Sequence, residues 1–462
     1  MAIVEDVTAE DEVTQVEEQS AGDLISELEK LTAQLQVPTE LVPGFMAALD
    51  QNALDHYRLK ALGILHDIRG KVNSPKWEEV DSEVQFKVME NVIRLNGDDP
   101  WSSVDIRSII QDLLPKLDHS IPLLILPKLK PYFASHPSLS SNFRALSRPI
   151  GGKDSTIDLH DIQPFKDPNS WGIINLLSFS LEQLNSIEIE KNIGLILPPT
   201  LILMDDWEPL WRLKGTKILE KWINKLNKEI MKLMGIDKLL INSLIHTISL
   251  QSNPPLKGIL EITIKLIQKC NENYSKEMID FYSEIIEKGI IQGWIYAPSG
   301  LEGRSILIHI NEMLLVFCDL MGTGIIRWLK NIIPNLLQPL QYPPTQVVLP
   351  HYQSNLSTLL YIMKKIRKTE RVERWRGQIL NILCRLWVQL KERRGILSLE
   401  EEEEEDENDK NLNEEIRSLI KSIFQELENQ IPSIKQDEFN KLLQLSPNLF
   451  NDFISNNLNL TI

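Results

Sequence analysis

One short pattern recurs along this chain, and its recurrence constrains the fold more than any other feature. Residues 58–65 and 212–219 both read Arg-Leu-Lys, three variable residues, then Ile-Leu. Residues 374–380, Arg-Trp-Arg-Gly-Gln-Ile-Leu, form a looser third copy. Repeated units that cannot bury their apolar faces alone do so by stacking on their neighbours. We therefore expect stacked helical units, with chance similarity between amphipathic helices as the alternative.

The stretch 197–219 predicts a helix, a turn and a second helix. Pro198 and Pro199 are expected to open the first helix, because a proline at the first helical position loses no intrahelical hydrogen bond. Asp205 and Asp206 are expected to end it. Asp206 is also expected to be the N-cap of the second helix, with its carboxylate on free amides of the first turn.

The second helix of this stretch carries an apolar stripe, since its members recur at intervals of three and four residues: Trp211, Gly215, Ile218 and Trp222. The small residue of each copy is expected to let its helix approach a partner helix closely. These residues are Ala61, Gly215 and Gly377. Arg212 is expected to reach back to the aspartate turn. An acidic turn followed by an arginine and a small residue resembles HEAT-type helical pairs.

The charge of the chain is concentrated in two segments. The 462 residues carry a formal net charge of -16, yet residues 1–23 hold eight acids and no base, and residues 400–409 hold nine more acids. The remainder has 48 acids against 49 bases. Segments this acidic and poor in apolar residues are expected to be disordered. The nearly neutral body does not indicate direct nucleic-acid binding.

The hydrophobic pattern predicts an all-α chain. No stretch shows sustained alternation with period two, so no sheet is expected. The fold class is therefore a HEAT/armadillo-like solenoid of helical repeats. Breaks rich in Pro, Gly, Ser and Asp, together with the acidic runs, divide it as follows: an acidic tail at 1–21, helical repeats at 22–134, a linker at 135–170, the main helical body at 171–398, an acidic linker at 399–411 and a small helical piece at 412–462.

No catalytic, cofactor-binding or metal-binding pattern is present in the sequence. Gly151-Gly-Lys153 lacks the Ser or Thr and the upstream glycine of a phosphate-binding loop. Asp205 and Asp206 as a metal or acid-base pair are the weaker alternative to a capping role. Three well-separated cysteines favour a reducing compartment, and no signal or membrane-spanning run is evident. We expect a cytoplasmic and nuclear protein that is not an enzyme and has no small-molecule substrate.

A basic stretch near residue 370 allows two interpretations. The stretch contains two acids, Glu370 and Glu373. It also contains seven bases: Lys364, Lys365, Arg367, Lys368, Arg371, Arg374 and Arg376. Charge runs are commonly solvated faces, and the acidic run some thirty residues later could screen this one. The alternative is a docking patch for an acidic segment of a partner.

Two regions of the chain resemble the Tel-two-interacting-protein-two (Tti-two) family. The first has two prolines, an apolar run, paired aspartates, a basic residue, a glycine and two aliphatics: Pro198, Pro199, Leu201, Leu203, Asp205, Asp206, Arg212, Gly215, Ile218 and Leu219. Trp207 lies within it. The second region, 320–336, carries a basic, aromatic, leucine, lysine string that includes Trp328 and Lys330. The resemblance covers about residues 170 to 395, and the N-terminal third is similar only in being helical.

This resemblance implies a role in the TTT co-chaperone assembly. The implied partners are Tel-two and Tti-one type subunits, the heat-shock-ninety machinery and the phosphatidylinositol-3-kinase-related kinases that this assembly matures. The chain would then be a non-catalytic helical scaffold without a cofactor. From the residues alone, another helical-repeat adaptor, of the nuclear-transport or phosphatase-regulatory type, stays open.

Overall fold

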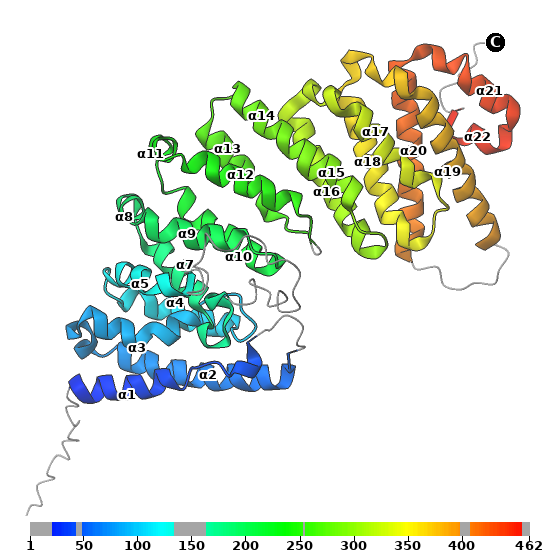
Figure 1. Ribbon diagram of the computed structural model, residues 1–462. Coiled ribbons are helices and arrows are strands. Elements are labelled where there is room, and N and C mark those ends of the chain that lie inside the picture. The colour runs from blue at the N-terminus through cyan, green and yellow to red at the C-terminus, as the bar shows by residue number, and fades with distance from the viewer. Residues whose placement is uncertain (1–20, 43–48, 134–162, 253–254, 398–406, 455–462) are drawn as a thin grey trace, which may run out of the picture. The chain divides into compact units, whose positions relative to one another are not determined.

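The chain is built of helices throughout the part that the structure describes (Figure 1). A computed structural model describes residues 21–42, 49–133, 163–252, 255–397 and 407–454. Within these ranges there is no β-strand, and successive helices pack against one another as in an α-solenoid. The all-α, helical-repeat fold expected from the sequence is confirmed.

The chain divides into two compact units. The first comprises residues 1–202 and 217–226, and the second comprises residues 203–216 and 227–462. The helices that lie wholly in the first unit are α1 Ala21–Ala33, α2 Gln51–Val72, α3 Ser82–Arg94, α4 Val104–Leu113, α5 Ile121–Leu129, α7 Ile173–Gln183 and α8 Ser186–Lys191. The division passes through α9 Ile193–Met204 and α10 Pro209–Ile223.

The second unit holds the remaining helices: α11 Lys228–Leu233, α12 Ile236–Ser249, α13 Gly258–Cys270, α14 Lys276–Ile285, α15 Gln292–Tyr296, α16 Leu301–Met321, α17 Leu329–Leu337, α18 Leu349–Lys365, α19 Arg376–Leu397, α20 Glu407–Gln430, α21 Glu438–Leu445 and α22 Pro447–Ile454. A π-helical turn, Ile286–Ile291, joins α14 to α15.

Helix α2 shows how the sequence produces these elements. The Asp50 carboxylate accepts hydrogen bonds from the amides of Asn52 and Ala53 and so caps the start of the helix. Along the helix, buried residues recur at intervals of three and four: Leu54, Tyr57, Ala61, Ile64, Leu65, Ile68 and Val72. The buried face packs against α1 and α4, and the exposed face carries mostly polar residues together with Leu59.

In the second unit, helices α16, α18 and α20 stack in parallel. Near the middle of α16 the Asn311 amide donates to Ser354 Oγ over 3.0 Å, and near its end Asp319 pairs with Lys365 over 2.7 Å. The later residue of α16 thus contacts the later residue of α18, so the two helices run in the same direction. Helix α20 continues the stack on α18, where Arg367 Nε donates to Glu426 Oε1 over 2.8 Å. Such i and i+2 stacking is the geometry of helical repeats. The piece beginning at α20 therefore packs on the preceding body.

The segments expected to be acidic tails or linkers lie mostly outside the described residues. These are 1–20, 134–162 and 398–406. The described part of the 135–170 linker consists largely of two short 3₁₀ turns, Pro164–Lys166 and Pro168–Ser170. Helices α5 and α7, on either side of that linker, pack against each other within the first unit. Helix α20 begins at Glu407, inside the stretch expected to be the acidic linker.

One described stretch, Leu301–Gln341, meets the length and composition of a membrane span, with a mean hydropathy of 1.5. Core helices of soluble proteins meet the same criterion. Here Ile310, Leu314 and Phe317 are fully buried within the protein. Of the most apolar part of this stretch, 44% is buried within the protein, so packing against neighbouring helices accounts for part of its apolar character.

The free energy of unfolding is expected to fall in mild acid because of His351. Burial, with a smaller effect from Arg304, lowers the pKa of His351 from 6.5 to about 4. Below pH 6.5 the unfolded chain binds a proton that the folded chain does not, so stability falls from pH 6.5 towards pH 4, by about 3 kcal/mol at most. Chemical unfolding at several pH values should show this slope, and His351→Asn should flatten it. An unchanged slope in the variant would assign the acid sensitivity to other groups.

Candidate functional site

The turn between α9 and α10 contains most of the residues that the sequence singled out. Pro198 and Pro199 lie inside α9 and do not open it, so that expectation is wrong. The helix begins at Ile193, whose side chain is buried with that of Ile196. An amide at position 198 would have donated to the carbonyl of Gly194, and Gly194 is exposed to solvent. The free energy gained by burying the apolar residues of α9 therefore exceeds the cost of the two backbone hydrogen bonds that the prolines cannot make.

Asp206 closes the turn instead of capping α10. Its carboxylate accepts from the Glu208 amide over 2.9 Å, before the helix starts at Pro209. The first amides of the helix, those of Trp211 and Arg212, donate to the Glu208 carbonyl over 3.2 and 3.3 Å. Glu208 is thus in the N-cap position, and the sequence placed the cap two residues too early. The side chain of Asp206 is buried.

Arg212 is a buried cation in the same turn. Only 4% of the residue is exposed, and its Nε has no hydrogen-bond partner among the described residues. Burial lowers the pKa of Arg212, and the negative charge of Asp206 opposes that shift. An arginine is so basic that it stays charged even so. The negative charge of Asp206 therefore offsets part of the cost of burying this cation.

Gly215 lies against the end of α9. A Cβ atom built at this position would lie 2.7 Å from the Met204 backbone nitrogen and 2.8 Å from the Leu203 carbonyl carbon. A side chain here therefore requires the two backbones to separate. Gly377, in the third copy of the sequence pattern, is exposed, and its Cβ would meet nothing within 4 Å. The expectation of a close approach at Gly377 is wrong.

Three residues of the α9–α10 turn face solvent, and we call them the turn surface: Asp205, Trp207 and Leu210. The exposed fractions of Trp207 and Leu210 are 39% and 49%. Asp205 Oδ1 lies 3.8 Å from His246 Nε2 of α12. The sequence did not single out Leu210. The available signal was its position on the side of α10 that carries Lys214 and Lys217, about 100° around the helix from the apolar stripe.

The region 320–336 also contains both a buried and an exposed residue of interest. Trp328 is buried, and its Nε1 donates to Glu287 Oε1 over 3.3 Å. Lys330, at the start of α17, is exposed. Trp328 therefore holds the chain before α17 against the preceding helical segment, and Lys330 is available at the surface.

The structure separates the basic stretch into two groups. Lys365 pairs with Asp319, Arg367 with Glu426, and Arg376 with Glu438 over 3.2 Å and with Glu373 over 3.6 Å. The other group is exposed, and its members make no ion pair with the residues that the structure describes: Lys364, Lys368, Arg371 and Arg374. We call these four residues the basic turn.

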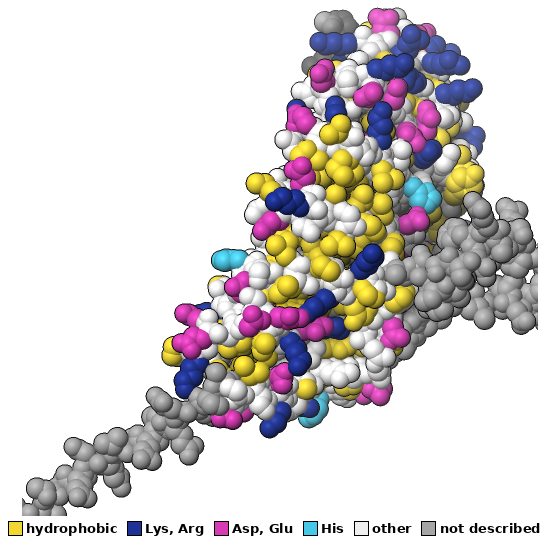
Figure 2. Space-filling view, turned by 60° about the vertical axis from the view of Figure 1, so that its left-hand side comes forward, with side chains coloured by type: hydrophobic (Ala, Val, Ile, Leu, Met, Phe, Trp, Pro, Cys, Tyr) yellow, Lys and Arg dark blue, Asp and Glu magenta, His cyan; other side chains and the backbone are white. Residues whose placement is uncertain are grey.

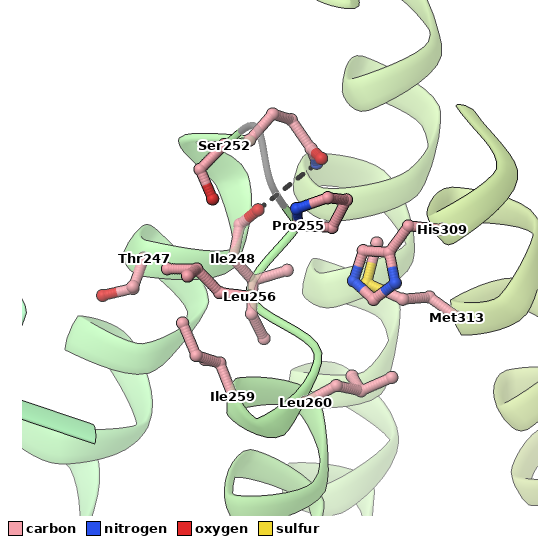
Figure 3. Close-up of a pocket in the computed structure, with 10 residues that line it drawn as sticks. Thr247, Ile248, Ser252, Pro255, Leu256, Ile259, Leu260, His309 and Met313 are labelled. Atoms are coloured by element: carbon pink, nitrogen blue, oxygen red, sulfur yellow. Dashed lines mark hydrogen bonds between the residues drawn. The ribbon is translucent and has the colours of Figure 1, made fainter. Parts of the chain in front are cut away.

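A cavity of about 20 Å³ lies between α12, the segment after it, α13 and α16 (Figure 3), and it is too small for a small-molecule ligand. Figure 3 shows His309 and Met313 on one side of it and Ile248 and Leu256 on the other. A single water needs at least about 10 to 15 Å³, whereas ligand pockets span about 300 to 1,000 Å³. Within the described ranges, no group of three His, Cys, Asp or Glu side chains is placed to hold a metal ion.

The larger hollow is an open groove of about 550 Å³ between α16, α18 and α20. Apolar residues such as Ile308, Leu315 and Leu419 line it together with polar ones such as Glu312 and Glu415. Figure 2 likewise shows apolar side chains in patches between charged ones on one face of the molecule. Surfaces of this mixed kind are suited to contacts with other proteins.

Comparison with known proteins identifies the family of the chain. The model of the Tti2 family matches residues 88–347, more than half of the chain. The match begins about eighty residues earlier than the sequence resemblance suggested and ends before the basic turn. It includes the α9–α10 turn, Trp328 and Lys330. No curated protein and no solved structure matches the chain.

Proposed function

The chain belongs to the Tti2 family, and from this premise we propose that it is a non-catalytic helical scaffold of the TTT complex. In this role it supports a co-chaperone assembly that matures and stabilises phosphatidylinositol-3-kinase-related kinases. The observation that carries the proposal is the family match over 88–347. The helical-repeat fold supports it, because stacked repeats present extended surfaces to partners.

Some residues of the α9–α10 turn are buried and others are exposed, and this difference supports a binding role for the exposed ones. Asp206, Arg212 and Gly215 are buried and hold the turn in place. The turn surface projects Trp207 and Leu210 from this rigid base. A partly exposed tryptophan on a rigid base is a frequent centre of binding energy in protein interfaces.

The proposed partners are Tel-two and Tti-one type subunits within the complex, and the heat-shock-ninety machinery and client kinases through the complex. The proposed localisation is cytoplasmic and nuclear, where such kinases act in DNA-damage responses and telomere maintenance. The role requires no catalytic residue and no cofactor.

Tagged chain purified from cells is expected to retain Tel-two and Tti-one type subunits. The double variant Trp207→Ala, Leu210→Ala should retain about tenfold less of a partner, since truncating a central interface residue often costs 2 kcal/mol or more. Quantitative mass spectrometry of the retained proteins measures this effect.

A matched control removes two exposed apolar side chains elsewhere in the second unit. Leu233→Ala with Tyr274→Ala changes residues whose exposed fractions are 88% and 84%. Equal losses in both double variants would show that the turn surface is not a specific contact. Retention of phosphatase or nuclear-transport subunits in place of the TTT subunits would contradict the proposed complex.

A further inference from the structure

We propose that the basic turn is a docking site for an acidic segment of a partner protein, rich in Asp and Glu. The site lies outside the residues that match the family, so it goes beyond the proposed function. Its four cations are Lys364, Lys368, Arg371 and Arg374. They lie within eleven consecutive residues, at the end of α18 and in the two 3₁₀ turns that follow it, Arg367–Thr369 and Arg371–Trp375.

The basic turn is held rigidly by its neighbours. Arg367 binds both carboxylate oxygens of Glu426, and only 3% of the Glu426 side chain is exposed. Burial alone would raise the pKa of Glu426, but hydrogen bonds from Arg367 and Gln430 hold it below its usual range. Ile366 and Val372 anchor the same turn in the core. Rigid placement lowers the entropy lost when a partner binds.

The local charge favours an acidic occupant. In a chain of net charge -16, the three other bases of the stretch already pair with Asp319, Glu426, Glu373 and Glu438. Near the four cations of the basic turn in sequence lie Glu370, beside Arg371, and Glu373, which is paired with Arg376; Lys364 also contributes to lowering the pKa of Glu426. Glu370 adopts a left-handed backbone with φ of 55°, a conformation that costs energy for a residue with a side chain.

The acidic run of the same chain cannot serve as the occupant. Helix α19 starts beside the basic turn and extends for 22 residues, so its end at Leu397 lies about 33 Å away. Nine residues connect Leu397 to Glu407, and they can extend about 35 Å in total. A path to the basic turn and back is roughly twice that length. The occupant of the basic turn is therefore not the acidic run between α19 and α20. An acidic segment of a partner protein has the charge that the four cations require.

Fluorescence anisotropy with the full chain tests the proposal. The probe is a labelled peptide of eight alternating Asp and Glu residues, and its comparison is an equally long peptide of Asn and Gln. The variant Lys364→Gln, Lys368→Gln, Arg371→Gln, Arg374→Gln should bind the acidic probe about tenfold more weakly or worse, with a binding rate that loses its salt dependence.

The control variant removes the same total charge elsewhere in the second unit: Lys228→Gln, Lys232→Gln, Lys238→Gln and Lys276→Gln. These lysines are exposed, and Lys228 and Lys238 lie 3.8 and 4.0 Å from Glu229 and Glu277. We expect a change in probe binding of less than about twofold, because exposed ion pairs contribute little. Equal weakening in both variants would overturn the proposal, because net charge alone would then explain binding. Both variants should keep the wild-type melting temperature.

Two further outcomes also decide against the proposal. If the probe binds only after residues 1–20 are deleted, the occupant is the chain's own acidic tail. If a single-stranded oligonucleotide binds the basic turn more tightly than the acidic peptide, the partner is a nucleic acid. No binding of the probe to either the full or the shortened chain excludes the docking site.

Discussion

Gly215→Ala is expected to destabilise the protein by about 1 to 3 kcal/mol, the usual cost of forcing extra volume into a packed contact. The new methyl group would lie within 2.8 Å of the backbone at Leu203 and Met204. Because backbone atoms cannot turn aside as a side chain can, α9 and α10 must separate. Thermal denaturation should show a lower midpoint, and amide hydrogen exchange should be faster in these two helices.

The matched control for this prediction is Gly377→Ala. Both glycines follow an arginine in copies of the same sequence pattern, yet a Cβ at Gly377 meets nothing within 4 Å. Alanine there should stabilise the first turn of α19 by up to about 1 kcal/mol, because alanine favours helix more than glycine does. Equal destabilisation by both changes would show that the contact with α9 is not the cause.

Asp206→Ala is expected to destabilise the protein by about 1 to 3 kcal/mol, the usual cost of removing one partner of a hydrogen bond at a buried site. The turn loses the hydrogen bond from the Glu208 amide, and the buried Arg212 loses a negative charge that opposes the lowering of its pKa. Asp206→Asn can keep that hydrogen bond while removing the charge. The difference in unfolding free energy between the two variants therefore separates the two contributions.

The adjacent Asp205 provides the control, because it is the same residue type in the same turn. It is exposed and lies 3.8 Å from an exposed His246, so Asp205→Ala should change stability by less than about 1 kcal/mol. If its loss reduced partner retention without changing stability, Asp205 would be a contact residue of the turn surface. If Asp205→Ala destabilised as much as Asp206→Ala, the assignment of buried and exposed aspartates would be wrong.

The fold followed from the sequence because its determinants are local. The intervals between apolar residues in α2 and in α10 select helix, and the lack of period-two alternation excludes sheet. Gly215 could also be recognised, since a small residue within an apolar stripe indicates a close contact. Gly377 carried the same local signal, but no helix lies opposite it. Whether a neighbour is present is a tertiary property that the local pattern does not contain.

The details of the turn could not be derived in the same way. Prolines usually begin helices, yet burial of Ile193 and Ile196 extends α9 by five residues before Pro198. An aspartate before a helix is commonly its cap, yet Pro209 moves the start of α10 so that Asp206 binds the amide before it. The seven bases near residue 370 looked alike in sequence. Only the packing of α16, α20 and α21 shows which of them already have acidic partners.

The parallel stacking of α16, α18 and α20 has a mechanical consequence. The bonds that tie Asp319 to Tyr361 and Lys365 lie at the surface, and exposed ion pairs contribute little to rigidity. One directional bond crosses the buried contact between α16 and α18: the Asn311 amide donates to Asn355 Oδ1 over 2.6 Å. Sliding one helix along the other would break this bond and leave a buried polar group without its partner, which costs more than losing a bond at the surface. This buried pair, and not the surface bonds, is therefore expected to fix how far α16 and α18 can slip past each other.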